Sequence, residues 1–144
     1  IMSDAVKTRG DFRHFETLST RWGDNDMYGH VNNVVYYAYF DTVVNRLLIE
    51  QAWLNPLQDK VIALVAQTQC RFLSSIAFPQ ILEIGLSVKR LGNSSVTYQL
   101  GVFIQGADNV AALGEFVHVY VDSQTRLPVP IPAKVREGLL VYHV

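Results

Sequence analysis

Apolar side chains in the first half of the chain recur at the spacing of a helix. After residue 33 they stand three or four positions apart and share one face, while polar and charged residues occupy the opposite arc. The apolar face consists of Tyr36, Phe40, Val43 and Leu47, flanked by Tyr37, Val44 and Leu48. This pattern predicts an amphipathic helix of about four or five turns. The helix should end by residue 55, because that residue precedes a proline.

After residue 60 the spacing of apolar residues changes to the alternation of strands. Strands are predicted over residues 61–72, 82–89, 96–104 and 111–121, with Gly, Asn and Asp at the turns between the last three. In the final strand the expected buried face consists of Ala111, Leu113, Val117, Val119 and Val121, interrupted by Glu115. Residues 12–22, rich in Thr, Phe and Trp, predict a further strand before the helix.

Together these elements predict an α+β fold, an antiparallel five-stranded sheet that buries one face against one long central helix. Prolines at 128, 130 and 132 keep the next segment extended, and residues 133–142 are expected to form a short C-terminal helix. The first half of the long helix is apolar all round, since Val34, Val35, Ala38 and Tyr39 extend its apolar face. Such a helix is buried on more than one side, and a sheet and a second subunit could supply the two sides.

Length and composition indicate one globular domain. The chain has 144 residues, 49% hydrophobic and 17% charged, and we expect a flexible N-terminal arm over residues 1–11 and a single domain over residues 12–144. The net charge of -1 gives no basic surplus for a nucleic acid or an anionic membrane. One cysteine, Cys70, excludes an intrachain disulfide, and no uncharged stretch approaches the roughly 20 residues of a membrane span. We therefore expect a cytoplasmic protein with no nucleic-acid or membrane partner.

Polar chemistry is concentrated where the predicted helix begins. Residues 21–33 place two acids, Asp24 and Asp26, in a Gly-punctuated turn shortly before the helix. A carboxylate can activate water or attack an acyl carbon, and the free N–H groups of a helix start can stabilise an oxyanion. Asp and Asn are also ordinary turn and helix-capping residues, so a structural role for either acid stays open.

Other sites have weaker support at this turn. Asp24, Asp26 and His30 could be imagined as metal ligands, but their spacing matches no recognised zinc or calcium pattern, and no metal is expected. For His30, a hydrogen-bonded turn histidine is a more common interpretation than a catalytic one. A Ser-His-Asp triad lacks its Gly-x-Ser-x-Gly elbow, and Cys70 lies inside a strand.

A second polar segment covers residues 89–95, which read Lys-Arg-Leu-Gly-Asn-Ser-Ser. Its two cations and its hydroxyl and amide donors surround a tight turn, which could hold phosphate groups at the surface. The same composition is typical of a solvated hairpin turn, so both interpretations remain open.

The run Arg-Trp-Gly-Asp-Asn-Asp-Met-Tyr-Gly-His-Val-Asn-Asn at residues 21–33, followed by Tyr-Tyr-Ala-Tyr-Phe-Asp at 36–41, closely resembles the signature of acyl-CoA thioesterases of the 4-hydroxybenzoyl-CoA thioesterase type. The resemblance extends over nearly the whole chain, including the 89–95 turn and the Pro-Ile-Pro at 130–132. It implies the hotdog fold and hydrolysis of acyl-CoA thioesters to free acid and CoA. No cofactor is implied, because CoA is part of the substrate.

The same resemblance implies roles for single residues. Asp26 would be the catalytic carboxylate, as general base or nucleophile, and the backbone N–H of Asn33 the oxyanion donor, while Asp24 supports the turn. The implied substrate-binding residues are His30, Asn32 and Tyr36 near the acyl group, and Lys89, Arg90 and Ser95 at the CoA phosphates. Family members are homodimers or homotetramers with sites between subunits, and we expect the same assembly here.

Two alternatives to acyl-CoA hydrolysis remain. The chain could hydrolyse acyl-carrier-protein thioesters, or it could be a non-catalytic hotdog module that binds acyl-CoA. Intact Asp26, His30 and Gly29 favour turnover over binding alone. The identity of the acyl chain is not indicated by the sequence.

Overall fold

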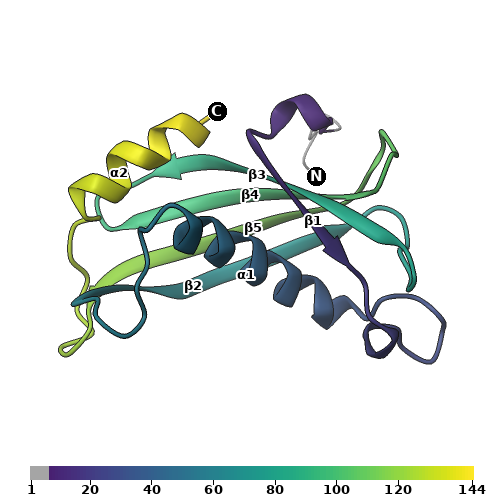
Figure 1. The fold of residues 1–144 in the computed structure, drawn as a ribbon, viewed down its shortest axis with the longest axis horizontal. Coiled ribbons are helices and arrows are strands. Elements are labelled where there is room, and N and C mark those ends of the chain that lie inside the picture. Colours follow the sequence, from purple (N-terminus) through teal and green to yellow (C-terminus); the bar gives the residue numbers. More distant parts are fainter. Residues whose placement is uncertain (1–6) are drawn as a thin grey trace.

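The computed structural model describes residues 7–144. An antiparallel five-stranded sheet holds one long helix against one face, with a short helix near the C terminus (Figure 1). The strands are β1 (His14–Ser19), β2 (Val61–Phe72), β3 (Ile81–Leu91), β4 (Ser95–Ile104) and β5 (Val110–Asp122), in the sheet order β1-β3-β4-β5-β2. The helices are α1 (Asn33–Glu50) and α2 (Ala133–Leu139), and short 3-10 turns span Arg9–Asp11, Trp22–Asp24 and Leu140–Tyr142. The predicted fold class is confirmed.

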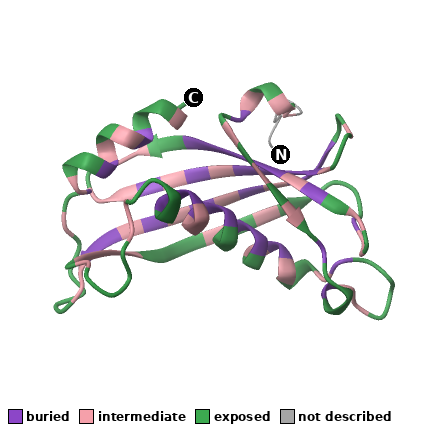
Figure 2. Cartoon of the chain, viewed as in Figure 1, coloured by how far each residue is buried: buried purple, intermediate pink, exposed green. Residues whose placement is uncertain are grey.

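Helix α1 buries the predicted face against the sheet (Figure 2). Its buried residues are Tyr36, Tyr39, Phe40, Val43, Val44, Leu47 and Leu48. They form one core with the inward side chains of β3 and β4, which are Leu82, Ile84, Leu86, Val88, Val96, Tyr98, Leu100 and Val102. The ring of Phe40 lies so close to Gly114 of β5 that a Cβ at residue 114 would overlap it. The glycine therefore permits the close approach of α1 to the sheet.

The buried face of β5 differs from the prediction. The side chains that enter the core from the middle of this strand are Ala112, Phe116, His118 and Tyr120, with Gly114 between them. Leu113, Val117 and Val119, predicted to be buried, are half-buried on the outer face of the sheet. Both faces of β5 are apolar, so alternation alone does not identify the inner one. The aromatic residues and the glycine decide it, because they fit the volume beneath α1.

The first strand is shorter than the predicted segment 12–22. Residues 14–19 pair with β3, and the chain then leaves the sheet at Thr20, whose hydroxyl donates to the carbonyl of Gln80 at 2.5 Å. A 3-10 turn at Trp22–Asp24 follows and leads toward α1. The end of β1 therefore lies beside the start of β3, next to the segment that carries the candidate acids.

Half of the N-terminal arm predicted over residues 1–11 can be assessed. Residues 1–6 of that arm lie outside the described range, and Arg9 contacts the sheet. Its guanidinium pairs with Glu83 at 2.8 Å, donates to the carbonyl of Ala107 and lies over the ring of Phe103, 4.7 Å from the centroid. These contacts with β3 and β4 join residues that are far apart in the sequence, so the local sequence does not reveal them.

Strand β2 forms one edge of the sheet. It is 12 residues long, pairs only with β5 among the described strands, and exposes Leu64 (38%) and Val65 (48%). A register shift between Val65 and Gln67 bends this edge. Long exposed edges are available for pairing with another chain. None of the helices within residues 7–144 has the length and apolar character that crossing a membrane requires.

Candidate functional site

The first candidate acid, Asp26, lies in a closed turn. An isolated bridge joins Asn25 to Val31, the Asp26 N–H donates to the His30 carbonyl at 2.9 Å, and the Gly29 N–H donates back to the Asp26 carbonyl at 3.0 Å. Gly29 has φ of +85°, a left-handed conformation that favours glycine. The Asp26 carboxylate is half-buried, and its Oδ1 accepts the N–H of Tyr28 at 2.8 Å. One carboxylate oxygen thus fixes the turn, and the other accepts no hydrogen bond within residues 7–144.

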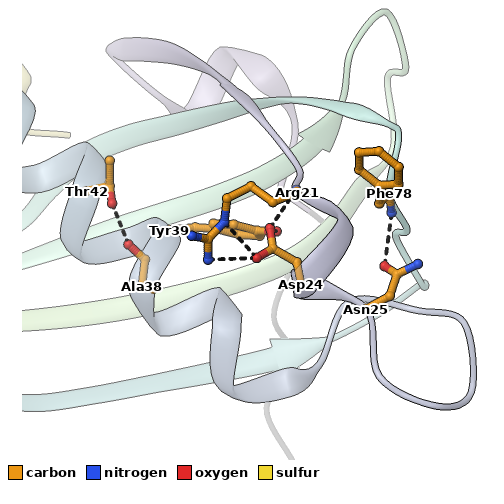
Figure 3. A network of polar contacts seen from close by, with 7 residues as sticks. All are labelled: Arg21, Asp24, Asn25, Ala38, Tyr39, Thr42 and Phe78. Atoms are coloured by element: carbon orange, nitrogen blue, oxygen red, sulfur yellow. Dashed lines mark hydrogen bonds and ion pairs between the residues drawn. The ribbon is translucent and has the colours of Figure 1, made fainter.

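Asp24 has a different environment, although only one residue separates the two acids. Its side chain is fully buried, with Arg21 at 2.9 Å and the Tyr39 hydroxyl donating to Oδ2 at 2.7 Å (Figure 3). Burial would raise the pKa of Asp24, but the hydrogen bond from Tyr39 and the contacts with Arg21 outweigh it and hold the pKa below its ordinary value. Asp24 therefore supports the turn and ties it to α1, as expected from the sequence.

The start of α1 supplies free backbone donors. Asn32 caps the helix, with its Oδ1 accepting the Val34 N–H at 3.0 Å and its own N–H donating to the Asp24 carbonyl at 2.9 Å. The N–H of Asn33, the first residue of α1, has no acceptor within residues 7–144. First-turn amides lack intrahelical partners and lie at the positive end of the helix dipole, so this N–H can bind a developing oxyanion.

A cavity of about 220 Å³ opens at this helix start. It is lined by His30, Val31, Asn33, Tyr36, Phe72, Leu73, Ser74 and Ser75. Three residues predicted for the site, His30, Asn33 and Tyr36, are thus brought together. Asp26 does not line this cavity, but its backbone N–H donates to the carbonyl of His30, which does. Asn32 caps the helix and does not line the cavity.

Tyr36 and Phe72 both line the cavity. The two rings meet edge to face with centroids 4.9 Å apart, and Tyr36 is 3% exposed. Burial, with a smaller contribution from Cys70, raises the pKa of Tyr36 to about 12, so its hydroxyl keeps its proton at neutral pH. Tyr36 is therefore suited to shape the cavity and not to act as a base.

Residues 73–75 are cavity residues that the sequence does not indicate. They follow β2 and reach the helix start because the antiparallel sheet returns the chain to the end where α1 begins. The Val31 N–H donates to the carbonyl of Ile76 at 2.8 Å and fixes this connection against the turn. Two serines after a strand are a weak signal on their own, so only the topology identifies them.

The other predicted binding residues, Lys89, Arg90 and Ser95, lie at the opposite end of the sheet. Residue 81 of β3 pairs beside the acid turn, and the 11 residues of the strand carry the chain roughly 30 Å away. Lys89 points to the outer face and pairs with Glu115 at 2.5 Å. The turn itself is held by the Arg136 side chain, which donates to the carbonyl of Gly92. One chain therefore does not bring these residues to Asp26.

Two other groups of polar residues lie away from the acid turn. A larger cavity of about 420 Å³ on the outer face of the sheet is lined by Lys7, Gln69, Cys70, Arg71, Lys89, Gln99, Leu113, Gly114 and Glu115. The potential metal ligands that approach one another within the described chain are His14, Glu16 and Glu50. Glu16 is already held there by His14 at 2.7 Å and Arg46 at 3.2 Å. Neither group combines an acid with a helix start.

Known proteins resemble this chain in sequence and in fold. A family model described as the thioesterase-like superfamily matches residues 20–139. The crystal structure of the PA5185 protein of Pseudomonas aeruginosa is 47% identical, with 96% of this chain and 97% of that chain covered and a TM-score of 0.93. PA2801 of the same organism, a candidate thioesterase, is 25% identical, with 88% and 98% covered and a TM-score of 0.81. YsmA of Bacillus subtilis is 30% identical over 132 residues, 90% of this chain and 86% of YsmA.

Proposed function

Because the chain belongs to the thioesterase-like superfamily, we propose that it hydrolyses acyl-CoA thioesters to a free acid and CoA. The observation that carries this proposal is the position of the Asp26 turn against the start of α1, where the Asn33 N–H has no acceptor in the described chain. A thioester carbonyl needs little more than these two groups, because it lacks the resonance stabilisation of an amide. A cytoplasmic location belongs to the same proposal, and the single thiol supports it.

In the proposed mechanism the thioester carbonyl oxygen accepts the N–H of Asn33. As general base, Asp26 removes a proton from water while the water oxygen attacks the carbonyl carbon, and the negative charge moves to the oxygen beside α1. The carbon–sulfur bond then breaks, and the proton passes to the departing CoA thiolate. As nucleophile, Asp26 would instead attack the carbonyl carbon and form a mixed anhydride as the carbon–sulfur bond breaks and the CoA thiolate leaves. Water would then hydrolyse the anhydride to the free acid and the regenerated carboxylate, and its second proton would pass to the thiolate.

We also propose that the active protein is a homodimer, or a tetramer built from such dimers. The β2 edge can extend the sheet into a second copy. On α1, Val34 is 66% exposed and Ala38 is exposed, although the sequence predicts that this half of the helix is buried all round. A second copy would cover both surfaces and would complete the small cavity. Its Lys89, Arg90 and Ser95 turn would then bind the CoA phosphates, which one chain does not allow.

Replacing Asp26 by Asn tests the proposal. With folding intact, Asp26→Asn should lower kcat by about 10²–10⁴-fold, measured by thiol release from short, medium, long and aromatic acyl-CoAs. Asp108→Asn, an exposed acid in the β4–β5 turn, is the matched control and should retain wild-type rates. Near-normal hydrolysis by Asp26→Asn on every substrate would refute the role of this acid.

The same screen separates the two alternative functions. Saturable acyl-CoA binding by the wild-type protein without thiol release would identify a non-catalytic binding module. Faster hydrolysis of an acyl-carrier-protein thioester than of the CoA thioester with the same acyl group would identify the protein carrier as the substrate.

A further inference from the structure

We propose that Asn25 is a positioning residue that clamps the connection between β2 and β3, residues 73–80, against the turn that carries Asp26. This inference rests on the proposed hydrolysis, because it assigns Asn25 the task of keeping the two walls of the substrate cavity in a fixed relation. One wall comes from the acid turn and the start of α1, and the other from residues 72–75. These walls belong to separate segments of the chain, so something must fix the width between them.

The side chain of Asn25 bonds to both segments. Its Oδ1 accepts the backbone N–H of Phe78 at 3.0 Å in a half-buried position, and its Nδ2 donates weakly to the Gly29 carbonyl at 3.4 Å. Figure 3 shows the Asn25 amide directed at the backbone of Phe78. Because Asn25 immediately precedes Asp26, a movement of the connection would be transmitted to the acid through a single residue.

A second link lies on the opposite strand of the same small bridge. Asn25 and Val31 face each other, and the Val31 N–H donates to the carbonyl of Ile76 at 2.8 Å. Ile76 is 1% exposed, so this second link lies in the interior of the protein. The connection is therefore held at residues 76 and 78, on two sides of the acid turn. The first link depends on a side chain and can be removed without changing the backbone.

The connection also has an internal bond that provides a matched control. Within residues 77–80, the Oε1 of Gln80 accepts the N–H of Ala77 at 2.8 Å and makes no bond to the acid turn. Truncating Gln80 and truncating Asn25 thus each remove one bond between a side chain and a backbone amide in the same connection. Only the truncation of Asn25 removes a bond between the connection and the turn that carries Asp26.

The experiment compares Asn25→Ala, Asn25→Asp and Gln80→Ala with the wild-type protein on a short and a long acyl-CoA. Asn25→Ala should lower kcat by about 10- to 100-fold, because small displacements of a reacting group are costly, with a smaller change in KM. Its preference between the two chain lengths should also weaken. Asn25→Asp keeps an oxygen for the Phe78 N–H, so its kcat should be close to the wild-type value. Gln80→Ala should have the wild-type kcat.

Hydrogen exchange at the amide of Phe78 provides a readout that does not depend on activity. Exchange at this amide should become about tenfold faster or more in Asn25→Ala and stay slow in Asn25→Asp. Equal kcat and chain preference in Asn25→Ala and Gln80→Ala, or unchanged exchange at Phe78, would overturn the positioning role. A wild-type protein inactive on every thioester would instead refute the proposed function, and the exchange rates would still decide whether Asn25 clamps the connection.

Discussion

At the scale of single residues, the two acids of the turn differ because only one faces the interior. The Asp24 carboxylate is buried and accepts a hydrogen bond from a tyrosine fifteen residues later in the chain, whereas Asp26 is half-buried. A buried carboxylate is stable only with such partners, whereas a reactive one needs an unoccupied oxygen. The surroundings of each side chain therefore favour a structural role for Asp24 and are compatible with the catalytic role proposed for Asp26.

Removing the Tyr39 hydroxyl should show how far the buried Asp24 carboxylate depends on its hydrogen bond from Tyr39. Tyr39→Phe deletes a hydrogen bond to a buried carboxylate and should lower the free energy of unfolding at pH 7 by about 1–3 kcal/mol. The pKa of Asp24 is lowered in the folded state, so its stabilisation is present above the unfolded pKa of about 4 and is lost as pH falls through the folded value. Tyr39→Phe should thus lose less stability than wild type on acidification.

Denaturant titrations at pH 7 and near pH 3 measure both effects. Tyr37→Phe removes the hydroxyl of a half-buried neighbour on α1 and is the control. A loss of stability in Tyr37→Phe as large as that in Tyr39→Phe would show that the contact with Asp24 is not responsible.

His118 should make the protein sensitive to acid. The ring is 2% exposed, its Nδ1 has no partner within the described residues, and burial lowers its pKa to about 4. Because the unfolded pKa is about 6.5, the unfolded state binds the proton first, and stability falls as pH drops from 6.5 toward 4, by about 3 kcal/mol in total. His118→Phe should flatten the stability profile in this range, as measured by denaturant titration at successive pH values. An unchanged slope would contradict the assignment.

Much of the site is predictable at this scale, because Asp26, His30 and Asn33 are close in sequence and precede a clear helix pattern. The burial of His118 was not predicted, since it alternates with Val117 and Val119 on a strand whose two faces are both apolar. The contact of Asn25 with Phe78 was not predictable either, because it joins segments 53 residues apart.

At the scale of elements, the packing of α1 on the sheet depends on the absence of a side chain at Gly114. Helix and strand periodicity predicted the boundaries of β2 and the buried face of α1, since each has a single apolar pattern. Packing between elements decides which face of β5 is buried. The glycine in the middle of that face was the available signal, and an alternation rule assigns it no weight.

Gly114→Ala should therefore destabilise the protein. The new methyl group would overlap the Phe40 ring, and overpacking of this kind costs about 1–3 kcal/mol. Phe40→Leu removes the ring atoms that the new methyl group would meet. Gly114→Ala should therefore cost less stability in a Phe40→Leu background than in the wild-type protein. Gly23→Ala, with open space around the added carbon, is the control. Thermal and denaturant unfolding measure the stability of the wild type, the two single variants, the double variant and the Gly23→Ala control. Strictly additive effects of Gly114→Ala and Phe40→Leu would refute the contact.

At the scale of the whole molecule, the proposed site spans two copies of the chain. The acid turn and the 89–95 turn lie at opposite ends of one sheet, so a substrate that contacts both requires a second subunit. The sequence predicted a turn within each segment, and residues 92–94 form the second turn, while Lys89 and Arg90 lie in β3 and Ser95 in β4. The separation of the two turns depends on the direction of β3 and is visible only in the fold.

Mixing two defective proteins tests this arrangement. Arg90→Gln should weaken CoA binding and Asp26→Asn should stop hydrolysis, and in a mixed dimer one site carries both changes and the other carries neither. After subunit exchange, the mixture should recover about a quarter of the wild-type kcat/KM, because half of the dimers are mixed and each has one intact site. Asp26→Asn mixed with the double variant has no intact site and should stay inactive. No recovery in the first mixture would show that the residues do not act across subunits.

The turn held by Arg136 has a consequence for how such an enzyme could change its substrate. In the proposed dimer, the carrier end of the thioester is recognised by a hairpin on one copy and the acyl end by the loop after β2 on the other. Mutations that alter one preference would leave the other in place, so the two specificities could evolve as separate traits. Proteins that evolve from this one could then change the thioester carrier while keeping their preferred acyl-chain length. They could equally change the acyl-chain length while keeping the carrier, and neither change would alter the turn that carries Asp26.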